Sequence, residues 1–241
     1  MSNSLNDKAI VEAVRILYEQ AGLATAHLQS SIAPLAELMM TFNIRMEELY
    51  DLHYASAKHF LEKNIQHEVV MRDDKEELAG FLYAQQIDGY DYGVVLIRAN
   101  DLITRRRFSA AHEIGHYALH FQRLLEEDPN EIMTMVDGIN QISDEKTGSV
   151  EDVPQGEFHF TRGTLATVLN NKQLMLMERE ANQFAAELLM PEPVCRDRLM
   201  SLQKRLTKNP KVLITHLASE FLVSEAAMQR RLHHLHLITA A

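Results

Sequence analysis

The chain has 241 residues, with 34 acidic and 24 basic side chains and a formal net charge of −10. Apolar residues make up 46% and charged residues 24% of the sequence, which excludes a largely disordered chain and allows a sizeable core. The single cysteine, Cys195, excludes an intramolecular disulfide and a metal site built from several cysteines. The sequence has no signal-peptide pattern and no apolar run of the roughly 18 residues that a membrane span needs, so we expect a cytoplasmic protein without membrane contact.

The first sixty or so residues are predicted to be helical. Apolar residues recur at helical spacing from Ile10 to Tyr18, and Gly22 marks the expected end of that helix. Further helical stretches are predicted over residues 32–40, 46–52 and 55–63. We therefore expect a helical N-terminal extension over residues 1–62.

The periodicity changes after this extension. Short runs rich in branched and aromatic residues predict strands at residues 68–71, 79–84 and 92–98. A turn-forming segment between the last two runs predicts an antiparallel hairpin, and hence a small antiparallel sheet. If the strand at residues 94–98 lies at the sheet edge, an extended peptide substrate can pair with its backbone.

A helix is predicted from about Arg106 to Leu125, and a second one from Leu165 to Met190, where Pro191 and Pro193 end it. Between them, residues 121–160 hold ten acidic and two basic side chains and many turn-forming dipeptides. This stretch predicts an acidic insertion at about residues 121–165 with little regular structure. With its insertion, the expected core spans residues 63–195.

The predicted chemistry lies on the first of these helices, in the sequence His112-Glu-Ile-Gly-His116, an HExxH motif. Residues four apart share one helix face, so both imidazoles can reach a single ion, and Glu113 lies beside them. Two histidines and a glutamate in this pattern are typical of a catalytic zinc site. A catalytic zinc ion usually has three protein ligands and an open position for water, so the motif also predicts a third ligand from elsewhere in the chain.

The helix at residues 165–190 offers two candidates for that third ligand. Glu178 shares its helical face with residues such as Ala181 and Leu189, so we expect it to point inward. Glu180 lines up with Gln183 and Glu187 and is expected to face solvent. A carboxylate among core side chains is costly unless a cation or hydrogen bonds compensate it, which favours Glu178.

Two separated stretches resemble one family. The run from Arg105 to His120, which contains the HExxH motif, and the run Glu178-Arg-Glu-Ala-Asn-Gln-Phe-Ala-Ala-Glu-Leu-Leu-Met-Pro191 are similar to the ImmA/IrrE family of metallopeptidases. The strand that ends in Arg98-Ala-Asn100 and the later run from Leu217 to Leu232 match the same family's pattern. The resemblance covers about residues 60–125 and 170–238.

The resemblance implies an α+β, zincin-like (gluzincin) endopeptidase with one Zn²⁺ ion per chain, held by His112, His116 and Glu178. Glu113 would be the general base. Family members typically cleave a helix-turn-helix repressor and so relieve repression of stress-response or mobile-element genes in bacteria and phages. The 62 residues from His116 to Glu178 exceed the family's usual spacing, and the acidic insertion fills the difference.

Other candidate residues surround this site. Asn182, Tyr117, His120 and His159 are candidates for orienting a zinc-bound histidine or stabilising the oxyanion. His120 continues the i, i+4 series, but it lies about 12 Å along the helix axis from His112, which is too far for it to share their ion. Manganese or iron stays an alternative to zinc at such a site.

The C-terminal segment, residues 196–241, is predicted to be helical with a break at Asn209-Pro, and it is similar to a helix-turn-helix unit. Arg230 and Arg231 are its candidate nucleic-acid contacts. The acidic net charge argues against extensive DNA binding. The alternative function is therefore a DNA-binding or partner-binding transcription regulator whose zinc site is structural or inactive.

Overall fold

The computed structural model describes the chain over residues 3–24, 29–65, 75–87, 89–121, 131–138, 159–162, 171–206 and 209–238. For residues 3–6, 131–138, 159–162 and 171–174 within these ranges, the description covers the backbone alone.

The fold is α+β, with one five-stranded sheet in the order β1-β3-β2-β4-β5. The strands are β1 (Ile44–Leu49), β2 (Leu78–Ile87), β3 (Tyr90–Arg98), β4 (Glu131–Gly138) and β5 (His159–Arg162). β1 runs parallel to β3, and all other neighbouring strands are antiparallel. The sheet is therefore mixed and larger than the small antiparallel sheet predicted from the sequence, although the predicted antiparallel pairing is present in most of it.

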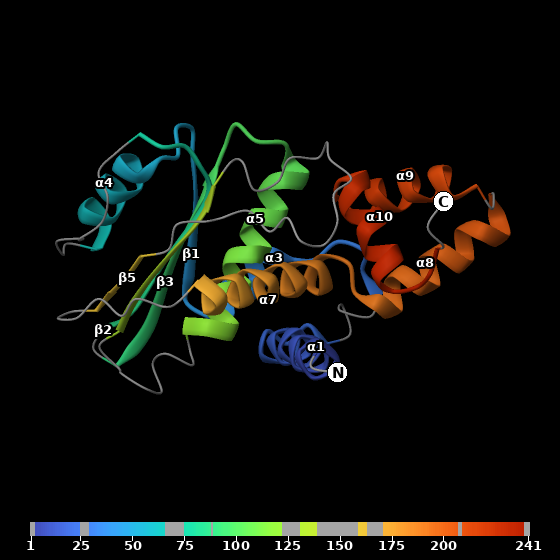
Figure 1. Ribbon diagram of the computed structural model, residues 1–241, viewed down its shortest axis with the longest axis horizontal. Coiled ribbons are helices and arrows are strands. Elements are labelled where there is room, and N and C mark those ends of the chain that lie inside the picture. Colours follow the sequence, from blue (N-terminus) through green and yellow to red (C-terminus); the bar gives the residue numbers. More distant parts are fainter. Residues whose placement is uncertain are drawn as a thin grey trace.

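Helices cover both faces of this sheet (Figure 1). They are α1 (Asn3–Gln20), α3 (Leu35–Thr41), α4 (Tyr54–Ile65), α5 (Ile103–His116), the π-helical turn η1 (Tyr117–Phe121), α7 (Asn171–Leu189), α8 (Glu192–Arg205), α9 (Pro210–Phe221) and α10 (Glu225–His234). α4 packs on one face, and α5, with α7 and α1 beyond it, lies on the other (Figure 1).

The two central strands are buried on both sides, because alternate side chains enter different cores. Phe81 and Val94 belong to the core beneath α4, whereas Leu82 and Val95 belong to the larger core shared with α5 and α7. This double coverage explains the continuous apolar runs at residues 78–84 of β2 and 94–97 of β3.

The predicted hairpin is confirmed, since β2 and β3 pair antiparallel from Gly80↔Ile97 to Ile87↔Tyr90. Gly89 in its turn has a φ of 80°, a left-handed conformation that glycine adopts readily. The hypothesis that the strand at residues 94–98 lies at the sheet edge is wrong. β3 lies between β1 and β2, so its backbone hydrogen-bonding groups pair on both sides and cannot receive a substrate strand.

Two further predictions about secondary structure are wrong. Residues 46–52, predicted to be helical, include most of β1, because pairing with β3 outweighs the helix propensity of Met46 and Glu47. The acidic insertion contributes β4 and β5 to the sheet, so it has more regular structure than its turn-forming dipeptides indicated. The predicted strand at residues 68–71 lies outside the described residues.

Most predicted helix ends are confirmed. α1 ends at Gln20, just before Gly22, and α7 ends at Leu189, just before Pro191. The break at Asn209-Pro is the start of α9, where the Asn209 side chain accepts a hydrogen bond from the backbone N–H of Lys211 at 3.0 Å.

The larger core is continuous from α1 to α10 and crosses both predicted domain boundaries, at residues 62 and 195. The predicted N-terminal extension supplies β1, and so takes part in the sheet as well. Among the helices that the structure describes, none has the length and apolar character needed to cross a bilayer.

A buried ion pair joins the C-terminal helices to α7. The guanidinium of Arg231 on α10 pairs with the carboxylate of Glu187 on α7, and its Nε donates to the carbonyl of Met190 at 2.9 Å. Glu187 is therefore buried, although it lies on the helical face on which Glu180 was expected to meet solvent. Arg231 lacks the exposure that a phosphate contact requires, so it is not the nucleic-acid contact proposed from sequence; Arg230 is exposed and stays a prediction.

Removing one member of this pair should destabilise the fold. We expect Arg231→Ala to lower the free energy of unfolding by about 3–5 kcal/mol, because it leaves the buried Glu187 charge without its partner. The double variant Glu187→Leu/Arg231→Met should lose much less free energy of unfolding, since it leaves neither charge buried without a partner. Urea unfolding followed by circular dichroism measures both, and equal losses would contradict this account.

Candidate metal centre

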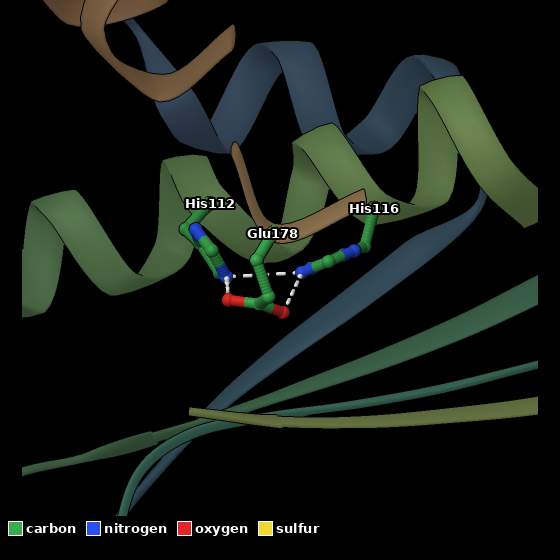
Figure 2. A group of neighbouring side chains, drawn as sticks. All are labelled: His112, His116 and Glu178. Atoms are coloured by element: carbon green, nitrogen blue, oxygen red, sulfur yellow. Dashed lines mark hydrogen bonds and ion pairs between the residues drawn. The ribbon is translucent and has the colours of Figure 1, made fainter. Parts of the chain in front are cut away.

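Helices α5 and α7 bring three ligand-type side chains together (Figure 2). The Nε2 atoms of His112 and His116 lie 3.0 Å apart. The carboxylate of Glu178 reaches both rings, with Oε1 3.0 Å from Nε2 of His116 and Oε2 3.4 Å from Nε2 of His112. All three residues are buried, so the sequence argument placed Glu178 correctly on the inner face of its helix.

Close contact between the two helices makes this convergence possible. Gly115, inside the HExxH motif, lies against α7, where an added Cβ would stand 3.2 Å from the backbone of Ala181 and 3.1 Å from the ring of Phe184. With hydrogen at position 115 and a methyl at 181, the helix backbones approach closely enough for Glu178 to reach between the histidines. The small residues are therefore a condition for the cluster.

Burial and charge set the protonation states of the cluster. Burial lowers the pKa of His116 to about 3, although the charge of Glu178 opposes that shift. Burial raises the pKa of Glu178, but the two imidazoles outweigh this effect and hold the pKa well below its ordinary value. A neutral imidazole and an ionised carboxylate are the forms that bind a divalent cation.

The spacing of the two imidazole nitrogens and the Glu178 carboxylate suits a single metal ion. A tetrahedral zinc ion with bonds of about 2.0 Å holds its ligand atoms about 3.3 Å apart. The two Nε2 atoms lie 3.0 Å apart, and each lies 3.0 or 3.4 Å from one of the two oxygens of Glu178, which is close to that value. A buried carboxylate also needs compensating charge, which a cation would supply. The residues present therefore fit the metal that their types suggest.

Glu113 lies next to this cluster, buried against the sheet. Its Oε1 is so close to Gly80 of β2 that a Cβ added there would stand 2.8 Å from it. The carboxylate thus occupies space that a side chain at position 80 would fill. Gly80 drew no attention in the sequence, because the contact arises only when β2 packs under α5.

The remaining candidates occupy different positions. Tyr117 is buried, and its hydroxyl donates to the carbonyl of Phe42 at 3.1 Å, so it is engaged on the α3 side of the helix. Asn182 is half-buried on α7. His159 belongs to β5, but its side chain lies outside the described residues.

His120 contacts the cluster directly, since its Nδ1 lies 3.0 Å from Nδ1 of His116. Its Nε2 lies 3.2 Å from Oε2 of Glu180. The prediction that Glu180 faces solvent is therefore wrong: 22% of its side chain is exposed, and its carboxylate points to His120. A helical wheel cannot show this contact, because the partner comes from another helix.

An α+β fold with an HExxH helix and a carboxylate from a second helix is an arrangement expected of a metallopeptidase-like protein. Residues 64–137 and 156–233 match the IrrE N-terminal-like domain, the Peptidase M78 family, and together they make up more than half of the chain. The chain belongs to this family. The stretch between the two matches, residues 138–155, falls within the acidic insertion. No curated protein matches the sequence.

Widening the contact between the helices should weaken metal binding. We expect Gly115→Ala to push α7 away from α5, because the new methyl meets the Ala181 backbone, and to reduce zinc affinity at least tenfold while costing about 1–3 kcal/mol of stability. Gly80→Ala is the matched control, since its methyl meets the Glu113 side chain instead. Competition titration with a chromophoric chelator measures both affinities; equal affinities would contradict the proposed role of Gly115.

Proposed function

We propose that this chain is a zinc-dependent endopeptidase with a zincin-like, gluzincin-type core. One observation carries the proposal: two imidazoles and a carboxylate converge at metal-binding distances, and Glu113 lies buried beside them in a chain of a peptidase family. Zinc in such a site lowers the pKa of a water molecule to about 7 and polarises a peptide carbonyl.

Each protein group then has a distinct task. His112, His116 and Glu178 would hold the ion. Glu113 accepts the proton of the attacking water on its carboxylate and passes it to the nitrogen of the departing peptide. Gly80, which has no side chain, leaves room for that carboxylate above β2.

We further propose that the substrate is a helix-turn-helix transcriptional repressor, cleaved in a stress or mobile-element response in the cytoplasm. The resemblance to the ImmA/IrrE family supports this substrate class. Helix-turn-helix proteins encoded beside this gene are the first substrates to test.

The turn between α9 and α10 supports a second candidate function. α9 and α10 are joined by a short turn in which Leu222 adopts a left-handed conformation and Ser224 caps α10 by accepting a hydrogen bond from the N–H of Ala227 at 3.1 Å. This geometry is similar to a helix-turn-helix unit. With Arg230 exposed, a transcription regulator with a structural or inactive zinc site is the alternative.

The Glu113→Gln variant separates the two functions. If the chain is a peptidase, Glu113→Gln should keep its metal content and lose at least about a hundredfold in cleavage, because it removes the proton acceptor and leaves the three ligands in place. Metal analysis of protein purified without added metal, together with incubation of the neighbouring helix-turn-helix protein, gives both readouts. Full biological activity of Glu113→Gln would favour the regulator.

Gly80→Ala tests the placement of Glu113 without removing it. Its methyl would stand 2.8 Å from Oε1, so the carboxylate must move, although the flexible side chain allows this at little cost in stability. We expect unchanged zinc affinity, a small change in unfolding free energy and a clear loss of kcat. Unchanged kcat would show that the exact position of Glu113 above β2 does not matter for cleavage.

A further inference from the structure

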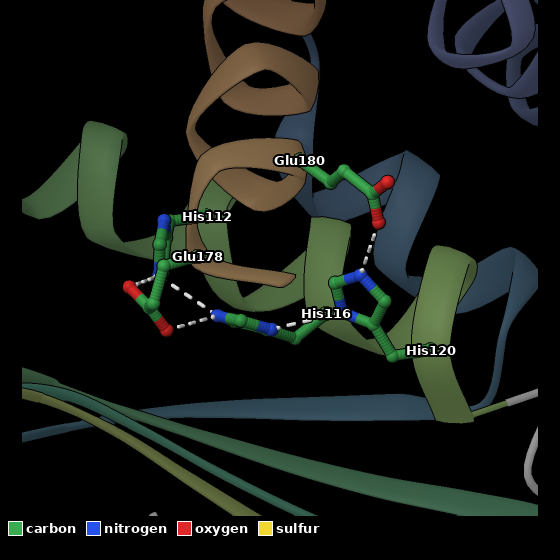
Figure 3. Close-up of polar contacts among 5 residues, drawn as sticks. All are labelled: His112, His116, His120, Glu178 and Glu180. Carbon is green, nitrogen blue, oxygen red and sulfur yellow. Dashed lines mark hydrogen bonds and ion pairs between the residues drawn. The ribbon is translucent and has the colours of Figure 1, made fainter. Parts of the chain in front are cut away.

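His120, one turn after the HExxH motif, and Glu180 of α7 form a row of contacts behind the metal-ligating residues (Figure 3). Nδ1 of His116 lies 3.0 Å from Nδ1 of His120, and Nε2 of His120 lies 3.2 Å from Oε2 of Glu180. The side chain of His120 is 7% exposed and that of Glu180 22%. These contacts therefore lie mostly out of reach of water.

The π-helical turn η1 carries His120. α5 ends at His116, and the backbone continues through Tyr117–Phe121 with hydrogen bonds that reach one residue further back than in an α-helix. Such turns occur often at functional sites. Here the wider turn holds the His120 ring beside His116, with ring centroids 5.1 Å apart and planes tilted by 50°.

One arrangement of protons satisfies both the contact of His116 with His120 and the contact of His120 with Glu180. If Nε2 of His116 is to offer its lone pair to a metal, the hydrogen of its neutral ring must be on Nδ1. That N–H then donates to Nδ1 of His120, whose own hydrogen is on Nε2 and is donated to the Glu180 carboxylate. Donors and acceptors alternate from Glu180 to His116, which fixes the tautomer that binds metal.

The two acids of α7 thus act on opposite sides of one histidine. Residues two apart in an α-helix point about 200° apart around its axis. Accordingly, Glu178 reaches Nε2 of His116, and Glu180 reaches the same ring indirectly through Nδ1 (Figure 3). The His116 ring is thus contacted at Nε2 by Glu178 of α7 and at Nδ1 by His120 of η1, which Glu180 of α7 contacts in turn.

We propose that His120 and Glu180 are positioning residues that orient His116 and hold it in its metal-binding tautomer. The inference rests on the metal site of the proposed function. It predicts that His120 and Glu180 act as one unit on metal affinity although neither touches the ion.

Zinc titration of the apoprotein against a chromophoric chelator tests this in a double-mutant cycle. We expect His120→Leu and Glu180→Leu each to weaken zinc binding about 10–100-fold. The double variant should be no weaker than His120→Leu, because breaking this row of contacts once already releases His116. His120→Gln should bind more tightly than His120→Leu, since its amide can both accept from His116 and donate to Glu180. The nitrogen chemical shifts of zinc-bound protein should show Nδ1 of His116 and Nε2 of His120 protonated.

Glu62→Gln is the control, because Glu62 is exposed on α4, across the sheet from the site, and should bind zinc like the wild type. Losses below threefold in both leucine variants, or losses that add in the double variant, would overturn the proposal. If a leucine variant fails to fold, the zinc affinities of His120→Gln and Glu180→Gln are compared with that of the wild type instead. A nitrogen spectrum of the zinc-bound wild type with His116 protonated on Nε2 and not on Nδ1 would then contradict the proposal. Wild-type protein that binds no zinc would refute the proposed function itself, whereas normal zinc binding by wild type and all variants refutes the positioning role alone.

Discussion

The close packing of α5 on α7 is the constraint on which the candidate site depends. Gly115 and Ala181 let the two backbones approach, and only then can an acid from one helix reach between two histidines of the other. The same contact places Glu180 against His120. The contact between α5 and α7 therefore places both the metal-ligating residues and the residues that contact them from behind. The sheet packs against Glu113 through Gly80 of β2.

Much of the site was predictable from sequence because its main signals are local. HExxH places two imidazoles on one face by helix geometry alone, and the apolar neighbours of Glu178 indicate that it points inward. The contacts that were missed all depend on a partner from another element. Glu180 and Glu187 share a polar helix face, yet one meets His120 and the other Arg231. No periodicity within α7 contains that information.

The errors in the fold have the same origin. β1 contains residues that favour helix, and β4 lies in an acidic stretch rich in turn-forming residues. Each nevertheless pairs with a buried strand of the sheet, β1 with β3 and β4 with β2. Pairing of this kind overrides local preference, because what stabilises a strand is mostly its neighbours. Helix ends were predicted better, since glycine, proline and capping residues act within a few positions of themselves.

The two stretches that match the family are joined within the sheet, because β4 pairs with β5. The chain leaves β4 after Gly138 and re-enters the sheet at His159, which is paired with Thr134 of the same strand. Residues 131–134 and 159–162 are thus held next to each other by strand pairing, and joining two held points costs only about 0.6 kcal/mol for each doubling of the number of residues between them. The distance along the sequence from the HExxH motif to Glu178 can therefore change with little effect on their distance in space.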